Sequence, residues 1–203
     1  MTPAKRLMDV VISLLLGLLL APFLMLLILM LLICEGRPVF YVSERMKTPD
    51  QGFGLIKLRT MHVGAGDGGV TGGNKQAAMS RLHRLLRKSR ADELPQLWNV
   101  LRGDISLVGP RPPLRRYVKA CPDLYARVLR SRPGITGLAS LVFHAHEERL
   151  LAVCNSAAET DAVYRCRCIP RKVRLDLIYQ RRRSVCYDLV LIGRTAIKPF
   201  RRE

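Results

Sequence analysis

The chain has 203 residues, and its 34 lysines and arginines outnumber its 16 aspartates and glutamates, which gives a formal net charge of +18. Such a field attracts polyanions, namely nucleic acids, anionic lipid headgroups or phosphorylated substrates. Aromatic residues make up only 6% of the chain and no nucleic-acid-binding motif is present, so recognition by base stacking is poorly supported. The six cysteines lack zinc-ribbon spacing, and we expect reduced thiols of a cytoplasmic protein.

A long apolar run, from residue 7 to residue 33, is the first element of the chain. It exceeds the stretch of about 20 apolar residues that crosses a bilayer core as a helix. A signal peptide is a poor explanation, because its apolar core is shorter and is followed by a cleavage site of small residues. The sequence therefore predicts a membrane segment over residues 1–36 and a cytoplasmic catalytic domain over residues 37–203.

Pro22 lies in the middle of this run and predicts a bend, because proline removes one helical hydrogen bond and crowds the preceding turn. Two shapes fit: a kinked helix that spans the membrane, and a re-entrant helix pair that enters and leaves by one face. Both flanks of the run are basic, and basic segments prefer the cytoplasm, which favours the re-entrant shape. A kinked span stays open, since a folded domain can be placed regardless of its charge.

Three charged residues mark the start of the membrane segment. Lys5, Arg6 and Asp9 are three to four residues apart and share one face of a helix. We therefore expect a local ion pair that neutralises Asp9 at headgroup level and fixes where the helix enters the membrane.

Short strands and amphipathic helices are expected in the remaining chain. Residues 38–43 and 55–61 have the pattern of strands, and residues 79–88 form a basic amphipathic helix. The glycine-rich stretch 64–73 reads as a loop and lacks the Walker pattern of a nucleotide-binding loop. The tail, 165–202, mixes basic and apolar residues as helices on a membrane surface do. The predicted fold is mainly α with a small β-sheet (α+β).

The acidic pair Asp92 and Glu93 opens the most regular helical pattern of the chain. Pro95 is tolerated only in a first turn, so this helix is predicted to begin near Asp92 and to stop at Gly103. A first turn offers free N–H groups that favour ionised carboxylates and a bound phosphate. Such a carboxylate can hold Mg²⁺ or attack phosphorus, although acidic residues also commonly cap helices.

The residues around this pair resemble a known family. The segment 89–112, SRADELPQLWNVLRGDISLVGPRP, is similar to the signature of the bacterial sugar transferases, the monotopic phosphoglycosyl transferases. The segments KRLMD (5–9), KLRTM (57–61) and RPGITGLA (132–139) resemble further motifs in the order of the family. The likeness covers most of the chain, and the central signature is highly specific.

The resemblance implies an enzyme of the bacterial inner membrane, acting at its cytoplasmic face, that starts polysaccharide or other glycoconjugate synthesis, exopolysaccharide included. Its members move a sugar-1-phosphate from a UDP-sugar to undecaprenyl phosphate and release UMP. By this resemblance Asp92 attacks the β-phosphorus and becomes a phosphosugar-aspartyl intermediate, and Glu93 helps to bind Mg²⁺. The family's re-entrant helix, with proline at its break, supports the re-entrant shape and assigns the break to Pro22. Anionic phospholipids are the expected surroundings.

Positive charge is needed beside a diphosphate, and four basic residues occupy motif positions for that role: Lys57, Arg59, Arg87 and Arg111. Arginine forks suit phosphate oxygens, which favours the two residues Arg87 and Arg111. For Lys57 and Arg59, contact with lipid headgroups is the alternative.

Two stretches depart from the family pattern. Ala21 stands where a serine often precedes the helix-breaking proline, and residues 139–148 differ from a region expected near the nucleotide or sugar. His144 and His146 show no metal spacing and are expected on a loop or surface. The identity of the sugar and the oligomeric state therefore stay open. The competing function is a non-enzymatic basic scaffold at the membrane surface.

Overall fold

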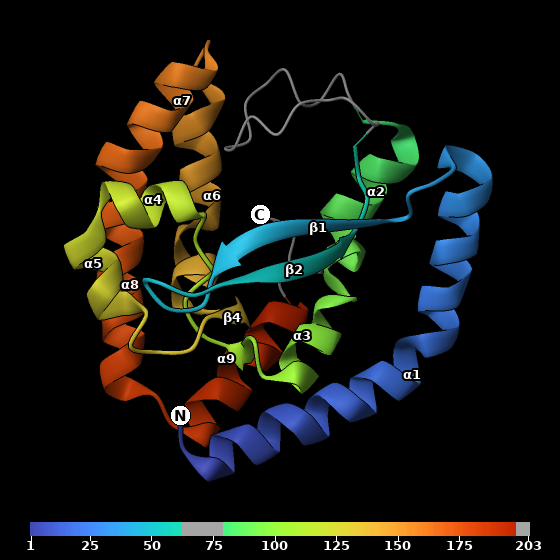
Figure 1. The fold of residues 1–203 in the computed structure, drawn as a ribbon, viewed down its shortest axis with the longest axis horizontal. Helices are drawn as coiled ribbons and strands as arrows, with labels where there is room; N and C mark the ends of the chain where they lie inside the picture. Colours follow the sequence, from blue (N-terminus) through green and yellow to red (C-terminus); the bar gives the residue numbers. More distant parts are fainter. Residues whose placement is uncertain (62–78, 198–203) are drawn as a thin grey trace.

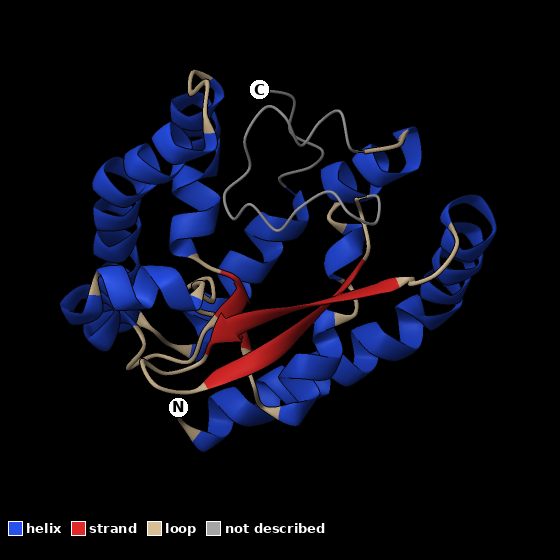
Figure 2. Cartoon of the chain, turned by 45° about the horizontal axis from the view of Figure 1, so that its top comes forward, coloured by secondary structure: helices blue, strands red, loops and turns tan. Residues whose placement is uncertain are grey.

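The structure is a computed structural model that describes residues 1–61 and 79–197, so the predicted glycine-rich loop 64–73 lies outside the described residues. It is mainly helical with two small sheets, which confirms the predicted fold class at that level (Figures 1 and 2). The helices are α1 (Pro3–Glu35), α2 (Arg81–Ser89), α3 (Gln96–Arg102), α4 (Arg115–Ala120), α5 (Pro122–Val128), α6 (Leu138–Ala152), α7 (Ala157–Val163), α8 (Ile169–Arg182) and α9 (Val185–Ile197). The strands are β1 (Phe40–Met46), β2 (Gly52–Leu58), β3 (Ser106–Val108) and β4 (Gly134–Thr136), and a 3₁₀ turn (Ala91–Glu93) and a π-helical turn (Tyr164–Cys168) complete the described elements.

The apolar run forms α1, which is long and apolar enough to cross a membrane. Figure 1 shows α1 bent into two arms, and Pro22 lies inside the helix. Both arms contact the rest of the protein: Asp9 and Ser13 are buried in the first arm, and Leu27 and Leu31 are buried in the second. The remaining large apolar side chains of α1 are mostly exposed, so the helix presents a broad apolar outer face.

The first arm of α1 is fixed by buried polar contacts that differ from the predicted ones. Asp9 accepts hydrogen bonds from Ser106 Oγ at 2.7 Å and from Leu107 N at 3.4 Å, both in β3. The expected local pair of Asp9 with Lys5 and Arg6 is therefore wrong. The reason is burial: Asp9 is fully inaccessible, and a buried carboxylate is stabilised by donors that share its enclosed environment.

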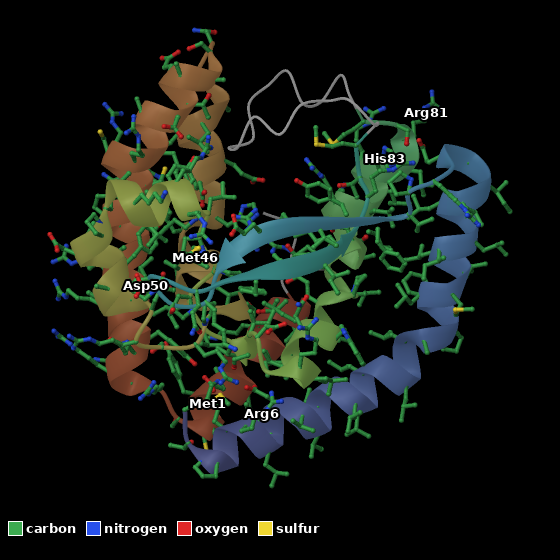
Figure 3. The ribbon with its side chains drawn as sticks, viewed as in Figure 1. Met1, Arg6, Met46, Asp50, Arg81 and His83 are labelled. Atoms are coloured by element: carbon green, nitrogen blue, oxygen red, sulfur yellow. The ribbon has the colours of Figure 1, made fainter. Side chains whose placement is uncertain are left out.

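The two basic residues of this arm bind other elements. Lys5 forms a buried ion pair with Asp188 of α9 and donates to Val108 O at 3.1 Å. Tyr179 of α8 joins this cluster, because its hydroxyl donates to Asp188 Oδ1 at 2.7 Å. Arg6, labelled in Figure 3, donates to two carbonyls in the last turn of α3 at 2.6 and 2.7 Å. These contacts attach the first arm of α1 to the folded part of the chain, and the predicted role in fixing where the helix enters a membrane stays a prediction.

The second arm of α1 packs against β2 and α2. Leu27 and Leu31 share an apolar cluster with Leu58 and Leu86. At the end of the arm, Nε2 of His83 in α2 (labelled in Figure 3) is close to Glu35. The distance from this nitrogen to a Glu35 carboxylate oxygen is 3.7 Å. The two ends of the apolar helix are therefore held by one folded domain.

Two sheets position the polar segments. Strands β1 and β2 pair antiparallel from Phe40 opposite Leu58 to Met46 opposite Gly52, so both predicted strands exist with shifted bounds. Strands β3 and β4 pair in parallel, which the sequence analysis did not predict. A Cβ at Gly134 would lie 2.2 Å from Gly109 N, so these two backbones cross too closely for a side chain.

The predicted helix 79–88 corresponds to α2, and the basic tail forms α8 and α9. Helix α8 packs against α5 and α6 through a buried face that includes Ile169 and Val173. All six cysteines are free in the structure, and their reduced state stays a prediction. Contact of these helices with a membrane surface stays a prediction.

Candidate active site

The acidic pair lies in a turn between α2 and α3, and the predicted start of α3 is wrong. Asp92 and Glu93 belong to the 3₁₀ turn, while α3 begins at Gln96 and ends before Gly103 as predicted. Pro95 is the cause, because it has no N–H to donate to the carbonyl four residues earlier. Local bonds three residues apart replace the helical ladder, for example Leu94 N to Ala91 O at 3.3 Å.

Arg90 places this turn at an angle to α2. It is the only non-glycine residue with positive φ among the described residues, at φ 57° and ψ 18°. Left-handed backbone is costly for a side chain with a Cβ, and it concentrates at functional sites. The conformation ends α2 and turns the next two carboxylates inward, where Asp92 is only 8% exposed.

Glu93 is the centre of a compact ion cluster. Its Oε1 lies 2.8 Å from Arg111 Nη2 and 3.6 Å from Lys57 Nζ, and its Oε2 lies 4.0 Å from Arg90 Nη1. Burial alone would raise the pKa of Glu93, but Arg111 and Lys57 outweigh it and hold that pKa at about 2. Glu93 is therefore an anion at any physiological pH.

The neighbouring groups titrate closer to neutrality. Burial, reinforced by the charge of Glu93, raises the pKa of Asp92 to about 6, although Lys57, Arg87 and Arg111 oppose the shift. Burial and the charge of Arg111 lower the pKa of Lys57 to about 8. Near neutral pH the site therefore holds an ionised Asp92 and a protonated Lys57, in surroundings where neither charge is well solvated.

The structure gathers three of the four predicted phosphate-binding residues. Lys57 and Arg111 contact Glu93. Arg87 is close enough for its charge to lower the pKa of Asp92, and its Nε donates a hydrogen bond to Thr60 Oγ1 at 2.9 Å. Arg111 follows β3, at the point where the backbone of Gly109 lies close to that of Gly134 in β4. Glycines are found there because the two backbones leave no room for a side chain.

Arg59 lies elsewhere. Its guanidinium donates to the carbonyls of Glu35, Gly36 and Arg37, at 2.7, 3.1 and 3.3 Å. These carbonyls lie at the end of α1, and Arg59 is only 8% exposed. The structure therefore does not bring Arg59 together with the carboxylates, and its visible contacts hold the end of the apolar helix.

Arg45 is a cation of the site that the sequence analysis missed. In the β1–β2 register Tyr41 is opposite Lys57, and side chains two and four residues on share its face, so Arg45 projects from the same face as Lys57. It donates to Pro112 O at 3.5 Å, and burial together with the charge of Arg111 lowers its pKa. No carboxylate in the ranges 1–61 and 79–197 forms an ion pair with it. The alternation of side chains along β1 was the sequence signal that could have placed Arg45 on the same face as Lys57.

The departing segment 139–148 forms most of α6. Glu147 pairs with Lys172 of α8 at 3.0 Å, and Lys172 also donates to Tyr164 Oη at 3.2 Å. His144 and His146 are on this helix rather than on a loop, and both are partly exposed.

The residues present fit a Mg²⁺ ion only if oxygens of the substrate complete its coordination. The described residues contain no group of three or more histidine, cysteine, aspartate or glutamate side chains able to hold a metal. Mg²⁺ commonly uses one or two carboxylates together with substrate phosphates and water. Arg111 and Lys57 both occupy Oε1 of Glu93, so Oε2, with Arg90 at 4.0 Å, is the oxygen available to such an ion.

Comparisons with known proteins give the following matches. A family model described as bacterial sugar transferase matches residues 1–202. A Caulobacter vibrioides UDP-glucose:undecaprenyl-phosphate glucose-1-phosphate transferase is 40% identical over 68% of the chain and 53% of its own length. A Klebsiella pneumoniae protein of the same description is 30% identical over 97% of the chain and 40% of its own length. An Aeromonas hydrophila UDP-N-acetylgalactosamine-undecaprenyl-phosphate N-acetylgalactosaminephosphotransferase is 31% identical over 68% of the chain and 34% of its own length. The chain thus spans about half or less of these relatives.

Proposed function

Because the chain belongs to the bacterial sugar transferases, we propose that it moves a sugar-1-phosphate from a UDP-sugar to undecaprenyl phosphate and releases UMP. The observation that carries the proposal is the buried Asp92, ionised near neutral pH beside Glu93 and surrounded by cations. The printed names of the relatives include glucose and N-acetylgalactosamine donors, so the sugar stays open. The proposed place of the reaction is the first membrane step of polysaccharide or glycoconjugate synthesis, exopolysaccharide included.

In the first half-reaction an Oδ of Asp92 forms a bond to the β-phosphorus, and the bond from that phosphorus to the bridging oxygen breaks. UMP leaves with the bridging oxygen and its electron pair, and the sugar phosphate stays on Asp92. In the second half-reaction a phosphate oxygen of the lipid forms a bond to the same phosphorus, and Asp92 is released. A carboxylate with a pKa of about 6 suits both steps, because it is ionised for attack and is also a good leaving group.

Fixed cations lower the barrier to bringing three anions together. Lys57 and Arg111 already face Glu93, and Arg87 is held by Thr60, so these donors are in place beside the acidic pair before a substrate binds. Mg²⁺ bound at Glu93 Oε2 would neutralise diphosphate charge and stabilise the leaving group. The contribution of the protein is to hold these charged groups in fixed positions in a partly buried site.

We further propose that α1 is re-entrant and that the active site lies at the cytoplasmic face of the inner membrane. A straight helix of this length would separate its ends by about 50 Å. Here both arms are anchored on one domain, the first through Asp9 and Lys5 and the second through Leu31 and Arg59. One domain cannot hold both ends from opposite sides of a bilayer, which supports entry and exit by the same face.

The test is UMP release from a panel of UDP-sugars by the purified protein with undecaprenyl phosphate and Mg²⁺. Asp92→Asn should abolish release, whereas the matched control Asp123→Asn, at an exposed position on α5, should retain it. Full activity in Asp92→Asn would remove the nucleophile assignment. Absence of UMP release from the unmodified protein with every donor would favour the competing function, a basic scaffold.

A further inference from the structure

A pocket of about 150 Å³ opens beside the acidic turn, between α3, β4 and α9. Its lining combines the charged residues Arg90 and Glu93 with the apolar residues Leu94, Leu97 and Ile135. A cation beside apolar side chains suits a ligand with an anionic head and an apolar tail.

Two threonines that line the pocket are joined by a hydrogen bond. The hydroxyls of Thr195 in α9 and Thr136 in β4 lie 2.6 Å apart, and Thr195 also donates to Leu191 O at 2.8 Å. Arg90, which also lines the pocket, has left-handed backbone. Strain of this kind is retained where the surrounding structure imposes a fixed geometry.

The pocket lies on the side of the domain that carries the membrane helix. Both of its helical walls, α3 and α9, pack against α1. The same two helices expose large apolar side chains outside the pocket: Trp98 at 58%, Leu189 at 47% and Val190 at 49%. A lipid leaving the bilayer alongside α1 would therefore meet exposed apolar side chains on both helices that line the pocket.

We propose that this pocket binds the acceptor lipid, with its first isoprenyl units against Leu94, Leu97 and Ile135 and its phosphate beside Arg90. This inference rests on the proposed function and adds the site of the second substrate. Arg90 neutralises the lipid phosphate as it approaches, and the adjacent turn presents the sugar phosphate held by Asp92. The phosphate oxygen then forms its bond to phosphorus as the bond to Asp92 breaks.

The test separates the two half-reactions. The variants Leu97→Gln and Ile135→Thr place polar atoms against the tail. The matched control Val153→Gln alters an exposed apolar residue at the end of α6 that does not line the pocket. UMP release without acceptor reports the first half-reaction, and transfer to farnesyl phosphate and undecaprenyl phosphate reports the second.

We expect the pocket variants to form the sugar-phosphate adduct at the normal rate, while their KM for lipid phosphate rises about tenfold. The control variant should keep the normal KM. If adduct formation is normal and both pocket variants also keep the normal KM, the inference is wrong while the proposed function stands. If the unmodified protein forms no adduct and no product, the proposed function itself has failed.

A second readout does not depend on activity. Farnesyl phosphate carrying a diazirine on its tail should cross-link to α3 and β4 near Leu97 and Ile135, and Leu97→Gln should reduce that cross-link. Unlabelled undecaprenyl phosphate should compete, and vesicles of phosphatidylglycerol should not. Equal competition by phosphatidylglycerol, or cross-links confined to other helices, would overturn the assignment even if a variant folded poorly.

Discussion

The pH dependence of the first half-reaction is a sharp test of the active-site electrostatics. Asp92 must be ionised to attack, and burial together with Glu93 raises its pKa to about 6. Lys57 must be protonated to help neutralise the diphosphate, and burial together with Arg111 lowers its pKa to about 8. The value of kcat/KM for the UDP-sugar should therefore follow a bell with limbs near these two values, because kcat/KM reports groups in the free enzyme.

The size of each limb follows from the same values. One unit below the pKa of Asp92 about one tenth of the molecules are ionised, so kcat/KM should fall about tenfold for each further unit of acidity. One unit above the pKa of Lys57 about one tenth of the molecules keep its charge, which gives a similar alkaline fall if the charge is essential. The assay is UMP release at saturating Mg²⁺, over about pH 5 to pH 9.

The variant Lys57→Arg distinguishes this explanation from general loss of activity at high pH. Arginine stays protonated throughout the range, so the alkaline limb should disappear while the acidic limb stays near pH 6. An unchanged alkaline limb in Lys57→Arg would show that another group controls it. A flat profile between about pH 5 and pH 9 in the unmodified protein would refute the assigned roles of both residues.

Three further predictions concern neighbouring residues. Arg45→Gln should raise KM for the UDP-sugar about tenfold in steady-state UMP release, because a hydrogen bond to a charged group is worth about 1.5–3 kcal/mol, and the exposed control Arg115→Gln should leave KM unchanged. Arg59→Gln should lower the thermal unfolding temperature and increase proteolysis at the end of α1 without a selective rise in KM, and a selective rise would restore it to the substrate site. Burial raises the pKa of Asp176 from 3.8 to about 7, so ionising this residue costs stability as pH rises through that interval. Asp176→Asn should therefore increase the free energy of unfolding by on the order of 4 kcal/mol above pH 7 and leave it unchanged near pH 4, as measured by thermal unfolding. An equal gain at both pH values would contradict this cause.

Local patterns in the sequence predicted the features with local causes. The apolar run is long enough to predict one long helix, and Pro22 inside it predicts the bend that α1 shows. The acidic pair Asp92 and Glu93 was found through its motif, and Lys57 and Arg111 prove to contact Glu93. The stop of α3 at Gly103 follows from its left-handed backbone, at φ 83°.

Contacts between distant residues were beyond sequence reasoning. Asp9 lies three and four residues from charged partners, yet it is bound by Ser106, which is 97 residues away. Arg59 stands two residues after Lys57 in the same motif, and strand alternation alone would place both side chains on one face. Strand β2 ends at Leu58, however, so Arg59 lies beyond it and binds the carbonyls at the end of α1 instead of Glu93. The parallel pairing of β3 with β4 depends on two backbones that lie too close for a side chain. Each strand has only three residues, which is too short for an alternating pattern to be recognised in the sequence.

The covalent intermediate on Asp92 is the central claim of this account. It is tested most directly by intact-mass analysis of the protein incubated with Mg²⁺ and a panel of UDP-sugars, without lipid acceptor, followed by peptide mapping. The account predicts a mass increase of one sugar phosphate, mapped to Asp92, lost on addition of undecaprenyl phosphate and absent from Asp92→Asn. Normal turnover with no such adduct, or with an adduct on another residue, would contradict it.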